Sequence, residues 1–309
     1  MKAQFPDEQS ETGAFVRQGD AFKKWVGRDV PAQPGRYHLY VSYACPWAHR
    51  TIIARKLKGL EDAIGMTVVD PVRDERGWRF AEGDGFTSDP CNGFSFLSEA
   101  YTATDPSYTG RVTVPVLWDT QSRTIVSNDD DDIMRMFETE FDPFAKHPDV
   151  DLYPQRYREE IDRLNGRIYE SLNNGVYKAG FATSQDVYEE NVREVFAMLD
   201  ELEGRLEHRR YLIAPTPVET DWRTFVTLVR FDAVYVGHFK CNLRRIVDYP
   251  NLWGYLRDLY QIDGISQTVR LDHIKRHYYY THDDINPTRI VPLGPLIDFT
   301  APHGREKLT

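Results

Sequence analysis

A cysteine at a predicted strand-to-helix junction is the best candidate for a reactive group in this sequence. Residues 36–43 (RYHLYVSY) are rich in aromatic and β-branched side chains, which predicts a β-strand. Pro46 suits the first turn of a helix, where a missing backbone N–H costs nothing. Cys45 would then stand at the start of that helix. There, backbone N–H groups and the helix dipole lower the pKa of a thiol and favour the nucleophilic thiolate.

The spacing around Cys45 predicts an enzyme that uses one cysteine and consumes an external thiol. Ala48 stands where a dithiol oxidoreductase would carry its second cysteine (C-P-W-A). A disulfide between Cys45 and a small molecule must then be released by a second thiol from solution. The alternative is a small buried cysteine after a strand, because a short motif alone is weak evidence.

Composition narrows the class of protein. The chain has 309 residues, enough for two domains, and its formal net charge of −10 argues against binding a phosphate backbone. Three cysteines, the lack of a long apolar run and the polar N-terminus predict a cytoplasmic protein with neither a disulfide framework nor a membrane span. Cys91 and Cys241 have no metal-ligand spacing, so we expect no metal.

The elements that would position Cys45 follow a thioredoxin-like order. After a polar extension at residues 1–35, the pattern predicts β-α-β-α-β-β-α, with strands at 36–43, 66–69, 111–119 and 124–126, and helices after Pro46, at 97–103 and after 127. On the first helix, apolar residues recur at helical spacing, and we expect four basic residues on the opposite, polar side: Arg50, Arg55, Lys56 and Lys58. Pro115 inside a strand pattern indicates an edge, a bulge or a cis bond. Ser127 or Asn128 is expected to cap the last helix.

The second half of the chain is predicted to be helical. Residues 141–154 contain three prolines and are expected to form a linker. Helical periodicity continues over 155–280, with the clearest segments at 184–206 and 221–236, and a tail at 281–309 follows. The fold class is therefore an α/β thioredoxin-like domain at 36–140 followed by an all-α domain.

Several stretches together resemble the glutathionyl-hydroquinone reductases, the xi class of glutathione transferases. The stretches are RYHLYVSYACPWAHRT (36–51), GWRF (77–80), TGRVTVPVLWD (109–119), NNGVYKAGFA (173–182) and HYYYTHDDINPTRIVPLGP (277–295). The resemblance implies an N-terminal thioredoxin-like domain, a C-terminal helical glutathione transferase domain and a homodimer. It also implies reduction of S-glutathionyl-hydroquinones to hydroquinone and glutathione disulfide.

The resemblance assigns roles to individual residues. Cys45 matches the family nucleophile, which attacks the thioether sulfur of the conjugate and forms a mixed disulfide. Trp78 and Arg111 match positions that line the thiol site, and Val114, before a cis-Pro115, would offer its backbone to the cysteinyl part of the ligand.

Two tyrosines match the family pair at the hydroquinone end. Tyr177 and Tyr278 would supply the proton that the leaving carbon must gain, and they would hydrogen-bond to the phenolic oxygens. Without the resemblance, neither stands out among 18 tyrosines, most of which are expected to pack in or around the core.

The sequence departs from the family at 127–132 (SNDDDD). The family has Glu-Ser at the start of this helix, where Glu binds the α-ammonium and Ser the α-carboxylate of glutathione; here Asp129 and Asp130 take these places. A carboxylate at 130 would repel a ligand carboxylate, whereas a serine hydroxyl donates a hydrogen bond to it. The alternative is that the acids only complement the helix dipole.

Three hypotheses follow. The first is reductive removal of a thiol from quinol conjugates, with glutathione as the thiol or, because of Asp130, a carboxylate-free sugar thiol such as mycothiol. The second is a general thioltransferase or dehydroascorbate-type reductase, as in omega-like relatives. The third is a non-catalytic binding protein of the same fold, which would need neither C-P-W-A nor the two tyrosines.

Overall fold

The computed structural model of the chain describes residues 6–308 and divides into two compact units. The thioredoxin-like unit comprises residues 19–151 and 267–277, and the helical unit comprises 152–266, 278–308 and the described residues up to Gln18. The predicted extension and tail thus include residues, 1–5 and 309, that lie outside the described range. The predicted fold class is confirmed, and the predicted domain boundaries stay predictions.

The thioredoxin-like unit is built on a four-stranded mixed sheet in the order β2-β1-β3-β4. The central strand β1 is parallel to β2 and antiparallel to β3, and β3 is antiparallel to β4. All five residues of β1 are buried, which agrees with its aromatic and β-branched sequence. The strands are β1 (Tyr37–Val41), β2 (Ile64–Val68), β3 (Val116–Asp119) and β4 (Thr124–Ser127).

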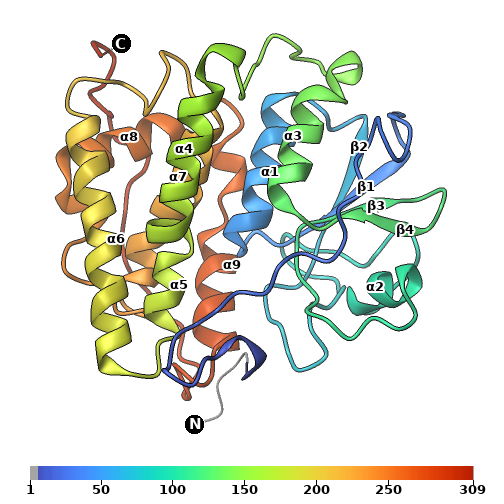
Figure 1. Cartoon of the computed structure of the whole chain (residues 1–309), viewed down its shortest axis with the longest axis horizontal. Coiled ribbons are helices and arrows are strands. Elements are labelled where there is room, and N and C mark those ends of the chain that lie inside the picture. Colours follow the sequence, from blue (N-terminus) through green and yellow to red (C-terminus); the bar gives the residue numbers. More distant parts are fainter. Residues whose placement is uncertain (1–5, 309) are drawn as a thin grey trace. The chain divides into compact units, whose positions relative to one another are not determined.

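Helices cover this sheet in the predicted β-α-β-α-β-β-α order. In Figure 1, α1 and α3 lie side by side, and α2 lies away from them, beside β4. The helices are α1 (Pro46–Leu57), α2 (Ser98–Thr104), α3 (Asp130–Thr139) and, later in the chain, α9 (Leu271–Arg276).

Three local expectations are wrong. The third strand begins at Val116 rather than Arg111, because Pro115 has no N–H to pair; the Val114–Pro115 peptide is cis. Asp129, not Ser127 or Asn128, is the N-cap of α3, since its carboxylate accepts the N–H groups of the helix's first turn.

The third concerns Arg50 and Lys58, which lie inside the protein rather than on a polar face. Each side chain is only 1% exposed, and each makes an ion pair with an aspartate, which offsets the cost of burying a charge.

The helical unit is built around one fully buried helix, α7. All twelve residues of α7 are buried, and α6 is the longest helix, with 21 residues (Figure 1). The helices are α4 (Arg158–Ile168), α5 (Gly175–Gly180), α6 (Gln185–Arg205), α7 (Glu219–Arg230) and α8 (Pro250–Tyr260).

Three helices continue into a π-helical turn. These turns are η4 (Tyr169–Asn173) after α4, η5 (Phe231–Tyr235) after α7 and η8 (His277–Thr281) after α9. Short 3₁₀ turns lie at Pro6–Glu8, Asp142–Phe144, Gln155–Tyr157, Ile246–Asp248 and Ser266–Thr268. Over residues 6–308, none of the helices has the length and hydropathy needed to cross a membrane.

Candidate active site

Cys45 is the N-cap residue of α1, as the strand-to-helix pattern predicts. Its backbone is extended (φ −78°, ψ 121°), and Pro46 follows as the first helical residue. The side chain is partly exposed and does not cap the helix; its Sγ instead donates a hydrogen bond to the carbonyl oxygen of Val114 at 3.4 Å. The structure thus brings Cys45 together with the Val114–Pro115 segment, and the thiol makes no capping hydrogen bond to the start of α1.

The other two cysteines have environments that oppose thiolate formation. Cys241 is completely buried, and burial raises the pKa of its thiol to about 12. Partial burial and the nearby Asp89 carboxylate also raise the pKa of the Cys91 thiol. All three cysteines belong to the described residues, and none of them forms a disulfide.

Trp78 lies in the long loop between β2 and α2 and is only 5% exposed. Its indole stacks on the imidazole of His277, with ring centroids 4.8 Å apart and planes inclined by 19°. The imidazole is held in turn by a 2.7 Å hydrogen bond between Nδ1 and the carbonyl oxygen of Pro71. These contacts fix the position of the Trp78 ring in the thioredoxin-like unit. Arg111 is half-buried in the segment before β3, where its carbonyl accepts a bond from Tyr108.

The carboxylate of Asp129 is already used by the protein. Its oxygens accept hydrogen bonds from the N–H groups of Asp131 and Asp132, and they pair with the ammonium of Lys23 at 2.9 Å. This hydrogen bond and the Coulomb attraction of Asp129 raise the pKa of Lys23. No local sequence pattern indicates this pair, because Lys23 lies 106 residues earlier in a polar, irregular segment.

Asp130 is paired with a buried arginine of α1. Its carboxylate lies 2.9 Å from Nη1 of Arg50, whose side chain is 1% exposed, and Asp131 adds a contact at 3.4 Å. The guanidinium also lies over the ring of Trp47, 4.7 Å from its centroid. The acidic run therefore does more than complement the helix dipole, since it neutralises a buried cation.

The two predicted tyrosines meet in the helical unit, although they lie 101 residues apart in the chain. The hydroxyls of Tyr177 and Tyr278 are joined by a short hydrogen bond, and that of Tyr235 lies 3.1 Å from the Tyr278 oxygen. Burial raises the pKa of Tyr278 well above its ordinary value, and the neighbouring Tyr177 adds to this shift. Arg17 lies over the Tyr177 ring, 4.9 Å from its centroid.

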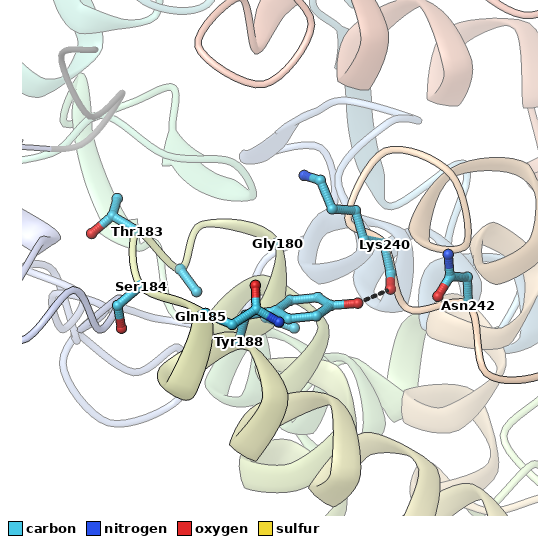
Figure 2. Close-up of a pocket in the computed structure, with 9 residues that line it drawn as sticks. Gly180, Thr183, Ser184, Gln185, Tyr188, Lys240 and Asn242 are labelled. Atoms are coloured by element: carbon cyan, nitrogen blue, oxygen red, sulfur yellow. Dashed lines mark hydrogen bonds between the residues drawn. The ribbon is translucent and has the colours of Figure 1, made fainter.

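A separate pocket of about 380 Å³ opens on the helical unit and contains none of the predicted site residues. Figure 2 shows it at the start of α6, where the hydroxyl of Tyr188 donates to the carbonyl of Lys240 at 2.7 Å. Within residues 6–308, no group of three or more His, Cys, Asp or Glu side chains could hold a metal ion.

Two family models match the chain. One is described as the N-terminal domain of glutathione S-transferase and covers residues 44–140, and the other as its C-terminal domain and covers residues 185–258.

Named relatives are similar over nearly the whole chain. The glutathionyl-hydroquinone reductase YqjG of Escherichia coli (strain K12) is 51% identical over 311 residues, covering 97% of this chain and 94% of that protein. Its glutathione-bound structure matches with a TM-score of 0.90 at 50% identity, covering 94% of this chain and 99% of the other. The glutathionyl-hydroquinone reductase PcpF of Sphingobium chlorophenolicum is 48% identical over 289 residues, covering 94% and 92%. The structure of a xi-class glutathione transferase from Natrialba magadii matches with a TM-score of 0.91 at 54% identity, covering 93% and 89%.

Removing the cation that holds Asp130 should destabilise the protein. We expect Arg50→Met to lower the free energy of unfolding by about 2–3 kcal/mol, because Asp130 loses the partner of a largely buried pair but keeps some access to water. Urea unfolding monitored by tryptophan fluorescence measures the change. The control is Arg28→Met, because Arg28 is exposed and pairs with Asp29 at 3.0 Å; its change should stay below about 0.5 kcal/mol. Equal, small changes in both variants would contradict a structural role for the Arg50 pair.

Proposed function

Since the chain belongs to the xi class of the glutathione transferases, the class that includes the glutathionyl-hydroquinone reductases, we propose that it removes the thiol from S-glutathionyl-hydroquinones by reduction. The observation that carries the proposal is the position of Cys45, which is partly exposed at the start of α1 with its sulfur 3.4 Å from the Val114 carbonyl. A thiol-containing ligand that hydrogen-bonds to the Val114 backbone would have its own sulfur close to that of Cys45.

In the first step, the Cys45 thiolate attacks the thioether sulfur of the conjugate. A disulfide bond forms between Cys45 and the glutathione sulfur, and the carbon–sulfur bond breaks. Its electron pair stays on the ring carbon, which takes up a proton, so the quinol is reduced and the two sulfurs are oxidised. Tyr177 and Tyr278 serve this step as proton donors and as partners of the phenolic oxygens.

In the second step, a thiolate from solution attacks the glutathione sulfur of the mixed disulfide. The products are glutathione disulfide and the regenerated Cys45 thiolate, and the thiol's proton replaces the one taken up by the quinol. The external thiol is required because Ala48 stands where a resolving cysteine would be.

Glutathione is the thiol that we propose, and the Arg50 pair supports this choice. An isolated carboxylate at position 130 would repel the ligand's α-carboxylate, but the charge of Asp130 is balanced by Arg50 at 2.9 Å. The second candidate is a sugar-linked thiol without a carboxylate. It is favoured by Asp130 itself, since a carboxylate that accepts hydrogen bonds suits sugar hydroxyls better than another carboxylate.

The first prediction of the mechanism concerns Cys45. Cys45→Ser should lower the rate of reductive cleavage by at least about a thousandfold, because a hydroxyl cannot form the mixed disulfide. Hydroquinone release measured by chromatography gives the rate, and intact mass spectrometry identifies the adduct on the wild-type protein. Cys91→Ser and Cys241→Ala are the matched controls and should keep the wild-type rate. Turnover that survives in Cys45→Ser would contradict the mechanism. Loss of turnover in a control variant would assign the nucleophile to that cysteine instead.

The tyrosines should matter for one half-reaction only. Tyr177→Phe or Tyr278→Phe should slow hydroquinone release by roughly ten- to a hundredfold, because the leaving carbon loses its proton donor. Thiol–disulfide exchange at Cys45, measured with a mixed disulfide substrate, should stay nearly unchanged. Because the pKa of Tyr278 is raised above about 10, this group stays protonated, and release should not fall as pH rises through the neutral and mildly alkaline range. Equal losses in both half-reactions would assign the tyrosines a structural role.

Asp130 should influence which thiol is used. Asp130→Ser frees Arg50 for a ligand carboxylate, so we expect kcat/KM for the glutathione conjugate to rise about three- to tenfold, a gain of up to ~1.4 kcal/mol. Adding Asp129→Glu restores the longer glutamate side chain with which the family binds the α-ammonium of glutathione. A conjugate of a carboxylate-free sugar thiol should lose kcat/KM in the same variants.

The control is Asp131→Ser, since Asp131 also contacts Arg50, at 3.4 Å, but is 43% exposed. The measurements are steady-state rates with matched conjugates at fixed salt. Rates that do not respond to Asp130→Ser would show that Asp130 acts only on Arg50 and the helix start. If the wild-type kcat/KM for the sugar-thiol conjugate exceeds that for the glutathione conjugate more than tenfold, the sugar thiol replaces glutathione as the proposed co-substrate.

A further inference from the structure

A third tyrosine completes a chain of hydroxyls in the helical unit. Tyr278 lies in the middle, with its oxygen bonded to the hydroxyl of Tyr177 and 3.1 Å from that of Tyr235. The exposed fraction falls from 8% for Tyr177 to 1% for Tyr278 and 0% for Tyr235. The chain of hydroxyls thus leads from the most exposed of the three rings into the core.

The hydroxyl proton of Tyr235 has to be donated within this cluster. Among the described residues, the Tyr235 hydroxyl has hydrogen-bond contacts only with the phenolic oxygens of Tyr278 and Tyr177. A fully buried hydroxyl that donates to nothing costs about 1–3 kcal/mol. Either hydroxyl of the 3.1 Å contact between Tyr235 and Tyr278 can donate, and a Tyr235 that donates to its nearer neighbour makes Tyr278 the acceptor.

A phenol that accepts a hydrogen bond becomes a better donor, because hydrogen bonds in a chain polarise one another. The arrangement that gains from this effect runs in one direction, from Tyr235 to Tyr278 to Tyr177. The proton of Tyr177, the most exposed member, is then left for an acceptor outside the cluster.

We propose that Tyr235 is a positioning residue for proton delivery, which acts through Tyr278 by fixing the direction in which the hydroxyls donate. The inference rests on the proposed function, in which Tyr177 protonates the departing carbon. Tyr177 gives up its proton, the Tyr278 proton follows onto the Tyr177 oxygen, and the Tyr278 oxygen carries the negative charge. Tyr235 keeps its own proton and stabilises this charge, and a proton from solvent later restores Tyr278.

The surroundings of Tyr235 hold its ring in a single place. The ring stacks on Phe239, with centroids 5.5 Å apart and planes inclined by 12°, and it meets Tyr278 edge-on at 5.7 Å. Tyr235 ends the π-helical turn η5, and Tyr278 belongs to η8. Turns of this kind interrupt regular helices and are frequent at functional sites.

A buried cation favours negative charge on the same cluster. The guanidinium of Arg230 is completely buried, and its charge acts to lower the pKa of both Tyr235 and Tyr278 against the larger opposing effect of burial. At the Tyr177 end of the cluster, Arg17 lies over the Tyr177 ring and donates to Oδ1 of Asn174 at 2.9 Å. The charge left on Tyr278 therefore has a cation near it and a hydroxyl that donates to it.

The experiment compares Tyr235→Phe with the wild-type protein in both half-reactions. The variant keeps the ring and removes only the hydroxyl, so we expect hydroquinone release to slow about tenfold, with KM and thiol–disulfide exchange at Cys45 unchanged. Adding Tyr235→Phe to Tyr278→Phe should cause no further loss, because Tyr235 acts through Tyr278. Additive losses, or an unchanged rate in a folded Tyr235→Phe variant, would overturn the proposal.

Tyr249→Phe is the matched control, since Tyr249 is also buried and donates to Asp200 at 3.0 Å, outside the cluster. It should leave both half-reactions at the wild-type rate, and thermal unfolding checks that both variants fold. A loss in Tyr249→Phe as large as that in Tyr235→Phe would mean that removing any buried hydroxyl slows release, which overturns the proposal. If Tyr235→Phe does not fold, a ring-fluorinated tyrosine at position 235 tests the same idea. The fluorinated tyrosine is a stronger hydrogen-bond donor, so the rate of hydroquinone release should begin to fall at a lower alkaline pH than in the wild-type protein. An unchanged pH dependence of hydroquinone release would overturn the proposal.

A readout without substrate separates this inference from the proposed function. Fluorine NMR of a ring-fluorinated tyrosine at position 177 follows its ionisation with pH. Removing the Tyr235 hydroxyl should raise the pH midpoint of this ionisation, because the ionised Tyr177–Tyr278 pair loses a hydrogen-bond donor. Wild-type protein inactive on S-glutathionyl-hydroquinones would end the proposed function but leave this test standing. An unmoved midpoint in an active enzyme would end only the role of Tyr235.

Discussion

A buried positive charge on the first helix constrains much of the thioredoxin-like unit. Arg50 is 1% exposed, and an isolated ion in that position would cost several kcal/mol. The carboxylates that balance it come from the first turn of α3, which fixes this turn against the helix that begins at Cys45. The helix that begins at Cys45 and the acidic run are therefore joined in one structural arrangement.

The same constraint explains why four consecutive aspartates are tolerated. Asp129 is satisfied by two backbone N–H groups and by Lys23, and Asp130 by Arg50. Asp132 lacks such an arrangement, and burial together with the neighbouring carboxylates raises its pKa. The charges of Asp129 and Asp130 are thus each compensated by a cation from another segment, and the proposed recognition of glutathione must compete with these pairs.

Local patterns in the sequence predicted most of the elements and few of their long-range partners. Strand β1, the start of α1 at Pro46 and the order of elements follow from periodicity and helix-start signals, which act over a few residues. The pairs Lys23–Asp129 and Arg50–Asp130 join segments 80 or more residues apart, and no local pattern encodes them. Arg50 illustrates this limit of sequence-based prediction. A charged residue on a helix is expected to be exposed to solvent unless its ion-pair partner is known. For the same reason, only a family resemblance could single out Tyr177 and Tyr278, and the roles of both stay predictions.

The tyrosine cluster is harder to explain by packing than by chemistry. Three phenol rings at 8%, 1% and 0% exposure contribute the same apolar contacts as phenylalanine, whose burial carries no polar group. Each buried hydroxyl must be satisfied, and the Tyr278 oxygen has hydrogen-bond contacts with the hydroxyls of both Tyr177 and Tyr235. Three neighbouring hydroxyls inside an aromatic cluster suit a task that needs ionisable groups, and in the proposed function that task is moving a proton to the departing carbon.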